Sequence, residues 1–383
     1  PHMENSQNQP DLSQTKPDDT ENDTENSRND ISDVSNNLEQ FPETIENSSD
    51  ERENIYKGDK LSHKNQNTTR IYCQNVNGFD IGRGGGDINN ICIDMKRTQT
   101  DILLATETRV CHRHTKIRKT INTTAQSILE HSLVVIASSR IKYPTYKKPG
   151  GTMIFTHGKT RGRVTEYRKD NYGRWSWMRL DTHRSGIVIV SIYQPSNQED
   201  YKHEGNKSKK TFRLQQHSMI LQDKRKGSPR EIFRKDLIKF LTDVKTNGDK
   251  ILLMGDFNEV FDANSGIMEV ATEIGLVDIF ENKMKHQDFS THIRNKNNQR
   301  IDYALGSPEL LDSIEKCGYQ PFGKDYKGDH RGFYIDFDTT KLFGAPLHEL
   351  VTLAKRGICS KDKKNRARYI NSKYKELLHH NFF

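Results

Sequence analysis

Short apolar runs separated by polar turns dominate the middle of the chain, and they predict strands more often than helices. Two such runs, 175–180 and 187–193, are joined by a turn that contains Gly186, which predicts a β-hairpin. Segment 232–244 instead spaces its apolar residues three and four positions apart, which is typical of an amphipathic helix. The other expected strands are 70–73, 101–105, 133–137, 152–155, 251–254, 301–305 and 333–337.

The two ends of the chain differ from this middle part in composition. Residues 1–66 are rich in Asn, Ser, Asp, Glu and Gln, and we expect an acidic disordered tail there because such a segment buries too little apolar area. Its first three residues, 1–3, resemble an expression scar. Residues 67–340 form the expected domain, which carries a basic insert at 199–230. Residues 341–383 form an expected basic helical extension.

Charge changes this picture, because the formal net charge of +8 combines two unlike parts. Residues 1–59 hold 16 acidic and 4 basic side chains, so the other 324 residues carry 56 basic and 36 acidic ones, a net of +20. A body this basic favours a polyanionic partner. No run approaches the roughly 18 apolar residues that span a bilayer, so we expect no membrane partner.

The cysteines and the short Cys/His cluster exclude two further classes of protein. The 5 cysteines are odd in number and scattered, which is typical of reduced thiols and not of a disulfide framework. The cluster Cys111-His112-Arg113-His114 lacks the second ligand pair that closes a tetrahedral zinc site.

We expect a nuclear protein that passes through the cytoplasm before import.

Polar side chains follow the expected strands at the point where each strand ends, and most are carboxylates or carboxamides. Loops that leave one edge of a sheet can bring such residues into one cleft. Oxygen ligands of this kind suit Mg²⁺ or Mn²⁺, which assist the attack of water on a phosphate ester. The ordered motifs are Asn75-Val76-Asn77-Gly78, Glu107-Thr108, Tyr193-Gln194-Pro195, Gly255-Asp256-Phe257-Asn258, Ile301-Asp302-Tyr303 and Asp329-His330.

This ordered set resembles the endonuclease/exonuclease/phosphatase superfamily, which includes DNase I-like and abasic-site nucleases. Within it, the set is most similar to the endonuclease domain of LINE-type (non-LTR) retrotransposons. The resemblance covers residues 70–340 and implies an α/β fold of four layers, in which two packed mixed β-sheets are flanked by helices. It also implies Mg²⁺- or Mn²⁺-dependent nicking of double-stranded DNA that leaves a 3′-hydroxyl for target-primed reverse transcription. A reverse transcriptase domain and element RNA would then be partners.

The resemblance implies metal-binding roles for four motif residues. Glu107 would be the principal ligand of the metal ion, supported by Asn75 and Asn77. Asp329 would assist this metal ion or hold a second one.

It implies catalytic roles for five others. Asp256 would orient or deprotonate the attacking water, and Asn258 would hold this water or a phosphate oxygen. His330, paired with Asp302, would donate to the non-bridging oxygens as negative charge develops. Tyr193 would stabilise the leaving 3′ oxygen.

Basic residues outside the catalytic positions are candidate DNA contacts. Arg83 lies in a Gly-rich segment that is either a flexible connector or a contact to the DNA backbone. Lys209 and Lys210 lie in the basic insert, which is either a solvated surface loop or a basic arm that binds a polyanion. Arg300 directly precedes the Ile301-Asp302-Tyr303 motif.

Two alternatives to a DNA nickase remain open. The same site could serve a phosphatase or an RNA deadenylase, and the same fold could be a catalytically inactive DNA-binding module. Asn298-Gln299 stand where abasic-site enzymes usually have Gly-Trp, which argues against dedicated abasic-site repair.

Overall fold

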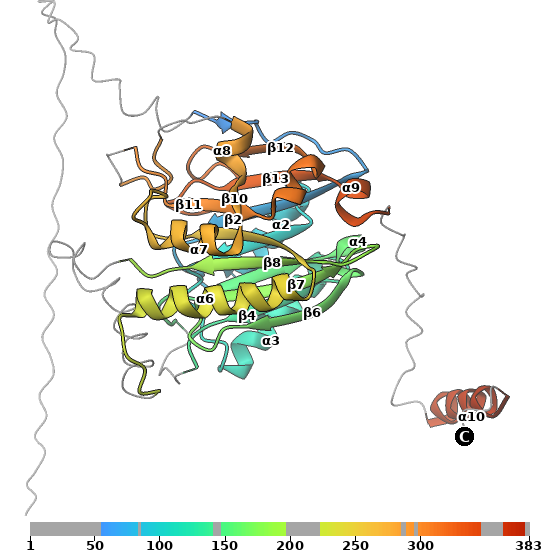
Figure 1. Ribbon diagram of the computed structural model, residues 1–383. Coiled ribbons are helices and arrows are strands. Elements are labelled where there is room, and N and C mark those ends of the chain that lie inside the picture. Colours follow the sequence, from blue (N-terminus) through green and yellow to red (C-terminus); the bar gives the residue numbers. More distant parts are fainter. Residues whose placement is uncertain are drawn as a thin grey trace, which may run out of the picture. The chain divides into compact units, whose positions relative to one another are not determined.

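Two β-sheets packed face to face form the centre of the protein (Figure 1). Apolar side chains from both sheets, among them Ile71 and Leu104 from one and Ile189 and Met254 from the other, form the buried core between them. Helices cover the two outer faces, which confirms the expected four-layer α/β sandwich. The computed structural model describes residues 55–82, 86–140, 147–196, 223–284, 289–294, 298–345 and 363–379.

The larger sheet has seven strands and one parallel pair, β2 and β3, at its centre. Its other neighbouring strands run antiparallel. Strand β2 is buried along its whole length, because a sheet or a helix layer covers each of its faces. The order across this sheet is β1 (Lys57–Gly58), β12 (Ile314–Tyr319), β13 (Phe333–Asp338), β2 (Thr68–Asn75), β3 (Ile102–Thr106), β5 (Thr152–Thr156) and β4 (Leu133–Ala137).

The smaller sheet has six strands and also holds one parallel pair, β8 and β9. The predicted hairpin is present as β7 and β8, which pair antiparallel. The order across this sheet is β10 (Val277–Asp278), β11 (Asp302–Gly306), β9 (Lys250–Asp256), β8 (Gly186–Tyr193), β7 (Trp175–Asp181) and β6 (Val164–Lys169).

Helices α2 (Gly86–Arg97) and α3 (Thr115–Ile128) pack on the larger sheet, and α6 (Pro229–Thr246) and α7 (Gly266–Ile274) pack on the smaller one. The predicted amphipathic helix lies within α6, which begins at a capping box formed by Ser228 and Glu231. No helix among the described residues is long and apolar enough to cross a membrane. The shorter described helices and the C-terminal one are α4 (Gly158–Arg161), α8 (Ile279–Met284), the 3-10 helix η3 (Pro308–Ser313), α9 (Thr339–Phe343) and α10 (Lys363–His379).

The folded chain begins earlier than the sequence predicts. Strand β1 pairs with β12 at the edge of the larger sheet, and the backbone N–H of Leu61 donates to Gln320 Oε1 at 3.1 Å. Residues 55–66, expected in the disordered tail, therefore belong to the domain. Residues 1–54, and the part of the basic insert from 199 to 222, lie outside the described residues.

Candidate active site

The two parallel strand pairs end at the same edge of the sandwich, and their last residues meet there. Asn75 ends β2 and Asp256 ends β9, so the two residues belong to different sheets. Asn75 Nδ2 donates to Asp256 Oδ2 at 2.9 Å, and each residue is only 1% exposed. The predicted site therefore lies where the two sheets join.

His330 and Asp302 form a buried pair beside this contact. His330 Nδ1 donates to Asp302 Oδ2 at 2.8 Å, and Asp302 lies opposite Asp256 in the β11–β9 ladder. The other ring nitrogen, Nε2, lies 3.9 Å from Asp256 Oδ2 and 3.3 Å from Asn75 Nδ2. Asp302 thus orients the imidazole so that Nε2 is directed toward Asp256.

Burial and charge shift the pKa values of this pair strongly. Burial is the main reason why the pKa of Asp256 is raised to about 8. The carboxylates of Asp302 and Glu107 contribute to this rise, and His330 opposes it. Burial alone would lower the pKa of His330, but Asp302 and Asp256 outweigh it and raise that pKa to about 10. The carboxyl groups that face His330 therefore favour the protonated form of its ring.

Asn258 fixes the second side of the Asp256 carboxylate. Its backbone N–H donates to Asp256 Oδ1 at 2.9 Å, and its Nδ2 donates to Asp256 Oδ2 at 3.0 Å and to the Gln194 carbonyl at 2.7 Å. Tyr193 ends β8 directly opposite Asp256 in the parallel ladder and is 4% exposed. The predicted catalytic residues Asp256, Asn258, Asp302, His330 and Tyr193 are therefore gathered at one place.

Glu107 lies in the turn that follows β3, and its carboxylate has two neighbours. It accepts from Arg109 Nη2 at 2.7 Å and from Asn75 Nδ2 at 3.4 Å. Arg109 also donates to Asn77 Oδ1, and Asn77 Nδ2 donates to Asp329 Oδ2 at 2.8 Å. The four predicted metal ligands thus form one connected group with Arg109, a residue that the motifs did not indicate.

Strained backbone accompanies these contacts. Asn77, Glu107, Arg109 and Asn258 all adopt left-handed backbone with φ between +48° and +54°. Such conformations cost free energy for residues other than Gly and accumulate at functional sites, where the surrounding structure holds them. Four of the site's residues thus have a backbone conformation that is uncommon for residues other than Gly.

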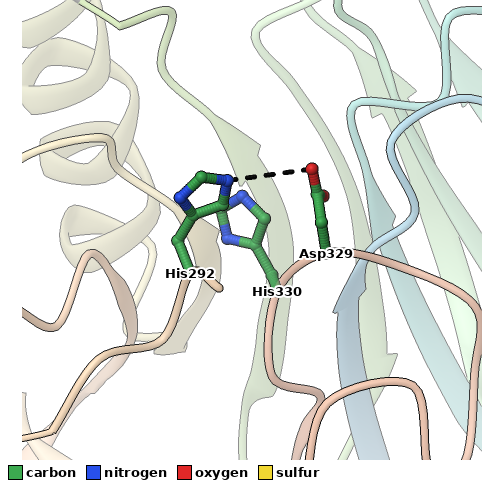
Figure 2. A group of neighbouring side chains, drawn as sticks. All are labelled: His292, Asp329 and His330. Carbon is green, nitrogen blue, oxygen red and sulfur yellow. Dashed lines mark ion pairs between the residues drawn. The ribbon is translucent and has the colours of Figure 1, made fainter. Parts of the chain in front are cut away.

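His292 is a second residue that the sequence did not indicate. Its ring lies against that of His330, with ring centroids 4.7 Å apart, and its Nε2 is 3.7 Å from Asp329 Oδ2 (Figure 2). Burial would raise the pKa of Asp329, but His292 and His330 outweigh it and lower that pKa. The ligand atoms of His292, Asp329 and His330 all lie within 4.8 Å of one another.

The donor set fits a divalent cation. Asp256 and Asp302 are buried and Glu107 is partly buried; Arg109 pairs with Glu107 and His330 with Asp302, and a cation would offset the remaining cost of gathering these carboxylates with Asp329. The side-chain oxygens of Glu107, Asn77 and Asp329 are hard ligands of the kind that Mg²⁺ and Mn²⁺ take.

The structure corrects one predicted DNA contact and does not describe three others. The guanidinium of Arg300 pairs with Asp278, lies 4.7 Å above the Tyr303 ring, and belongs to a side chain that is 15% exposed. Its charge is used inside the protein, where it balances a buried carboxylate, and not on a DNA-facing surface. Arg83, Lys209 and Lys210 lie outside the described residues.

Solved structures that align with this chain include nucleases and a phosphatase. The chain aligns with an AP endonuclease from Leishmania major at 15% identity and a TM-score of 0.51, over 77% of this chain and 96% of that one. An AP endonuclease from Archaeoglobus fulgidus aligns at 15% identity and a TM-score of 0.46, over 70% of this chain and 99% of that one. A 3′ phosphatase from Neisseria, bound to a product DNA hairpin, aligns at 14% identity and a TM-score of 0.47, over 70% of this chain and 99% of that one. No protein-family model and no curated protein sequence matches the chain. The likeness to the Leishmania enzyme shows that the two packed sheets and their flanking helices form the DNase I-like fold.

Proposed function

We propose that this protein is a metal-dependent endonuclease that hydrolyses a phosphodiester bond of double-stranded DNA and leaves a 3′-hydroxyl and a 5′-phosphate. The observation that carries the proposal is a pair of buried hydrogen bonds, Asn75–Asp256 and His330–Asp302, at the edge where the two sheets join. A carboxylate, an imidazolium and oxygen ligands for a cation are the groups that hydrolysis of a phosphate ester requires. The shared fold with an AP endonuclease supports the same reaction class.

Asp256 is the general base of this scheme. Its carboxylate is held by Asn75 on one side and by Asn258 on the other, so it has one orientation toward an attacking water. Its raised pKa makes it a stronger base than an ordinary carboxylate once it has lost its own proton.

His330 stabilises the negative charge that develops on the phosphate. Asp302 keeps the ring protonated and fixes its orientation, so Nε2–H can donate to a non-bridging oxygen without reorganisation during the reaction. Tyr193, beside Asp256 at the end of β8, would stabilise the leaving 3′ oxygen.

Mg²⁺ or Mn²⁺, held by Glu107 with Asn75, Asn77 and Asp329, would supply positive charge to the phosphate oxygens. Arg109, which donates to both Glu107 and Asn77, would keep these two ligands in place.

We further propose that the nick primes reverse transcription of a retroelement in the nucleus, with a reverse transcriptase domain and element RNA as partners. The motif resemblance to LINE-type endonucleases supports this role, and so does the basic body, whose net charge of +20 over residues 60–383 favours binding to the phosphate backbone.

The direct test is incubation of the protein with supercoiled plasmid and Mg²⁺, with and without EDTA. We expect conversion to the open-circular form that EDTA abolishes and that Asp256→Asn abolishes as well. Asp243→Asn, the same change at an exposed position near the end of α6, is the matched control and should cleave like the wild type. Release of phosphate from a small ester without plasmid cleavage would support a phosphatase instead. DNA binding without any turnover would support an inactive binding module.

A further inference from the structure

A cavity lies on the side of the sandwich, and none of the candidate site residues described above lines it. Its volume is about 220 Å³, room for roughly seven water molecules, which is more than a single ion needs. It lies between β4, the edge strand of the larger sheet, and β6, the edge strand of the smaller one, with α3 as a third wall. Its floor is apolar, from 134–136, and its other lining residues are His112, Arg118, Asn122, Tyr167, Arg168 and Lys169.

The rim of this cavity is positively charged and none of its lining residues is acidic. Arg118 and Lys169 are exposed, and neither side chain forms an ion pair or hydrogen bond within the described part of the chain. Arg168 is paired with Glu166 at 2.7 Å. Two cations that have no carboxylate partner among the described residues, beside one opening, create a positive potential that attracts an anion.

The pKa shifts of nearby groups agree with a positive potential at the cavity. Burial, together with the charges of Lys169, Lys148 and Arg113, lowers the pKa of His112 to about 4. Burial also lowers the pKa of Lys169, and Arg118 adds to the shift. These cations destabilise one another in the described structure, and a bound anion would relieve that repulsion.

Strand β6, which lines the cavity, ends at the same end of the sandwich as the candidate active site. Lys169 ends β6 opposite Ser176 of β7, and Ser176 lies opposite Ser191 of β8, two residues before Tyr193. Neighbouring strands are about 4.8 Å apart, so β6 lies roughly 10 Å to the side of β8 at this end. A nucleic-acid strand that leaves the active site can therefore reach the cavity within a few nucleotides.

We propose that this cavity binds an unpaired nucleotide of the nucleic-acid strand that flanks the cleavage site, an inference that rests on the proposed nuclease function. The backbone phosphate lies between Arg118 and Lys169, and the base enters over the apolar floor and stacks on Tyr167. The Tyr167 side chain suits this contact because it is 49% exposed, although large apolar rings are usually buried. The concave shape favours an unpaired nucleotide over a duplex, because a paired base cannot turn into a pocket.

The test compares the affinity of variants for two labelled DNAs in an Asp256→Asn background, which prevents turnover. The DNAs share one duplex, and one of them carries an unpaired extension on a single strand. Arg118→Glu/Lys169→Glu changes the cavity. Arg184→Glu/Lys341→Glu makes the same charge change at the opposite end of the sheets, at two exposed residues without side-chain partners among the described residues.

We expect the cavity variant to bind the extended DNA about tenfold more weakly than the control variant does. The slope of log affinity against log salt concentration should fall by about the amount that one phosphate contact contributes. Tyr167→Ala should lose about tenfold in affinity for the extended DNA and none for the plain duplex. Equal affinities of the cavity and control variants, or an equal loss on both DNAs, would overturn the inference and leave the nuclease proposal intact. A parent protein that binds neither DNA would overturn both.

Discussion

Asn75 Nδ2 donates to Asp256 Oδ2 at 2.9 Å, and this hydrogen bond joins the last residue of a strand in one sheet to the last residue of a strand in the other. Both groups are buried, so the bond acts in surroundings of low polarity, where it is stronger than in water. The orientation of the Asp256 carboxylate therefore depends on how the two sheets pack, and the site is a property of the whole sandwich.

Removal of this bond should slow catalysis without unfolding the protein. Asn75→Ala leaves Asp256 with Asn258 as its remaining amide partner among the described contacts, and we expect the rate of DNA cleavage to fall about 10- to 100-fold, as for other groups that orient a catalytic residue. Single-turnover cleavage measures the effect. Asn247→Ala, at the exposed end of α6, is the control, and an equal rate for both variants would contradict the role of Asn75.

Glu107 should control the requirement for a metal ion. Glu107→Gln keeps the shape of the side chain but removes its charge, so we expect the Mg²⁺ concentration for half-maximal cleavage to rise at least about tenfold. Glu273→Gln, an exposed position on α7, makes the same change away from the site. A Mg²⁺ titration of both variants and the wild type decides the matter. Coincident titration curves would show that Glu107 does not hold the metal ion.

The pH dependence of cleavage should report the raised pKa of His330. Asp256 must be unprotonated to act as base and the imidazolium must stay protonated to donate, so the wild-type rate should rise as the pH passes about 8 and fall as it approaches about 10. Asp302→Asn removes the first of the carboxylates that raise this pKa, so the alkaline fall should move to lower pH. Profiles of kcat/KM against pH test this shift. An alkaline limb at the same pH in both proteins would mean that another group is responsible for it.

A buried ion pair in the larger sheet should be costly to break. Arg70 Nε and Nη2 each donate to the Asp336 carboxylate at 2.7 Å, and the two side chains are 1% and 4% exposed. Asp336→Ala leaves an unpaired buried guanidinium, so we expect the free energy of unfolding to fall by about 3–5 kcal/mol. Urea denaturation measures it, with the exposed Asp312→Ala as a control that should change little. A loss as small as that of the control would mean that water reaches Arg70.

The sequence predicted the strands that carry the site and the residues at their ends. Asn75, Asp256 and Asp302 could be located because each terminates or begins a buried strand whose apolar run is visible in the sequence. Strands β6 and β12 were missed because charged residues and a glycine interrupt their apolar positions. Their pairing depends on neighbouring strands, which no local pattern records.

Arg109 and His292 show why the rest of the site could not be predicted. Arg109 reaches Glu107 and Asn77 only through a turn with left-handed backbone, which no residue type in this segment indicates. His292 reaches His330 through an isolated backbone bridge between two irregular segments. The basic residue Arg300 was wrongly predicted as a DNA contact, because its ion pair with Asp278, 22 residues earlier in the chain, forms only in the folded protein.

The most direct test of the proposed function is the chemistry of the ends that the protein produces. A duplex labelled on one strand, incubated with the protein and Mg²⁺, should acquire a nick whose 3′ end a DNA polymerase extends without prior treatment. Asp256→Asn should produce no extendable end, and Asp243→Asn should produce as many as the wild type. An intact strand together with inorganic phosphate released from a phosphorylated DNA end would contradict the account.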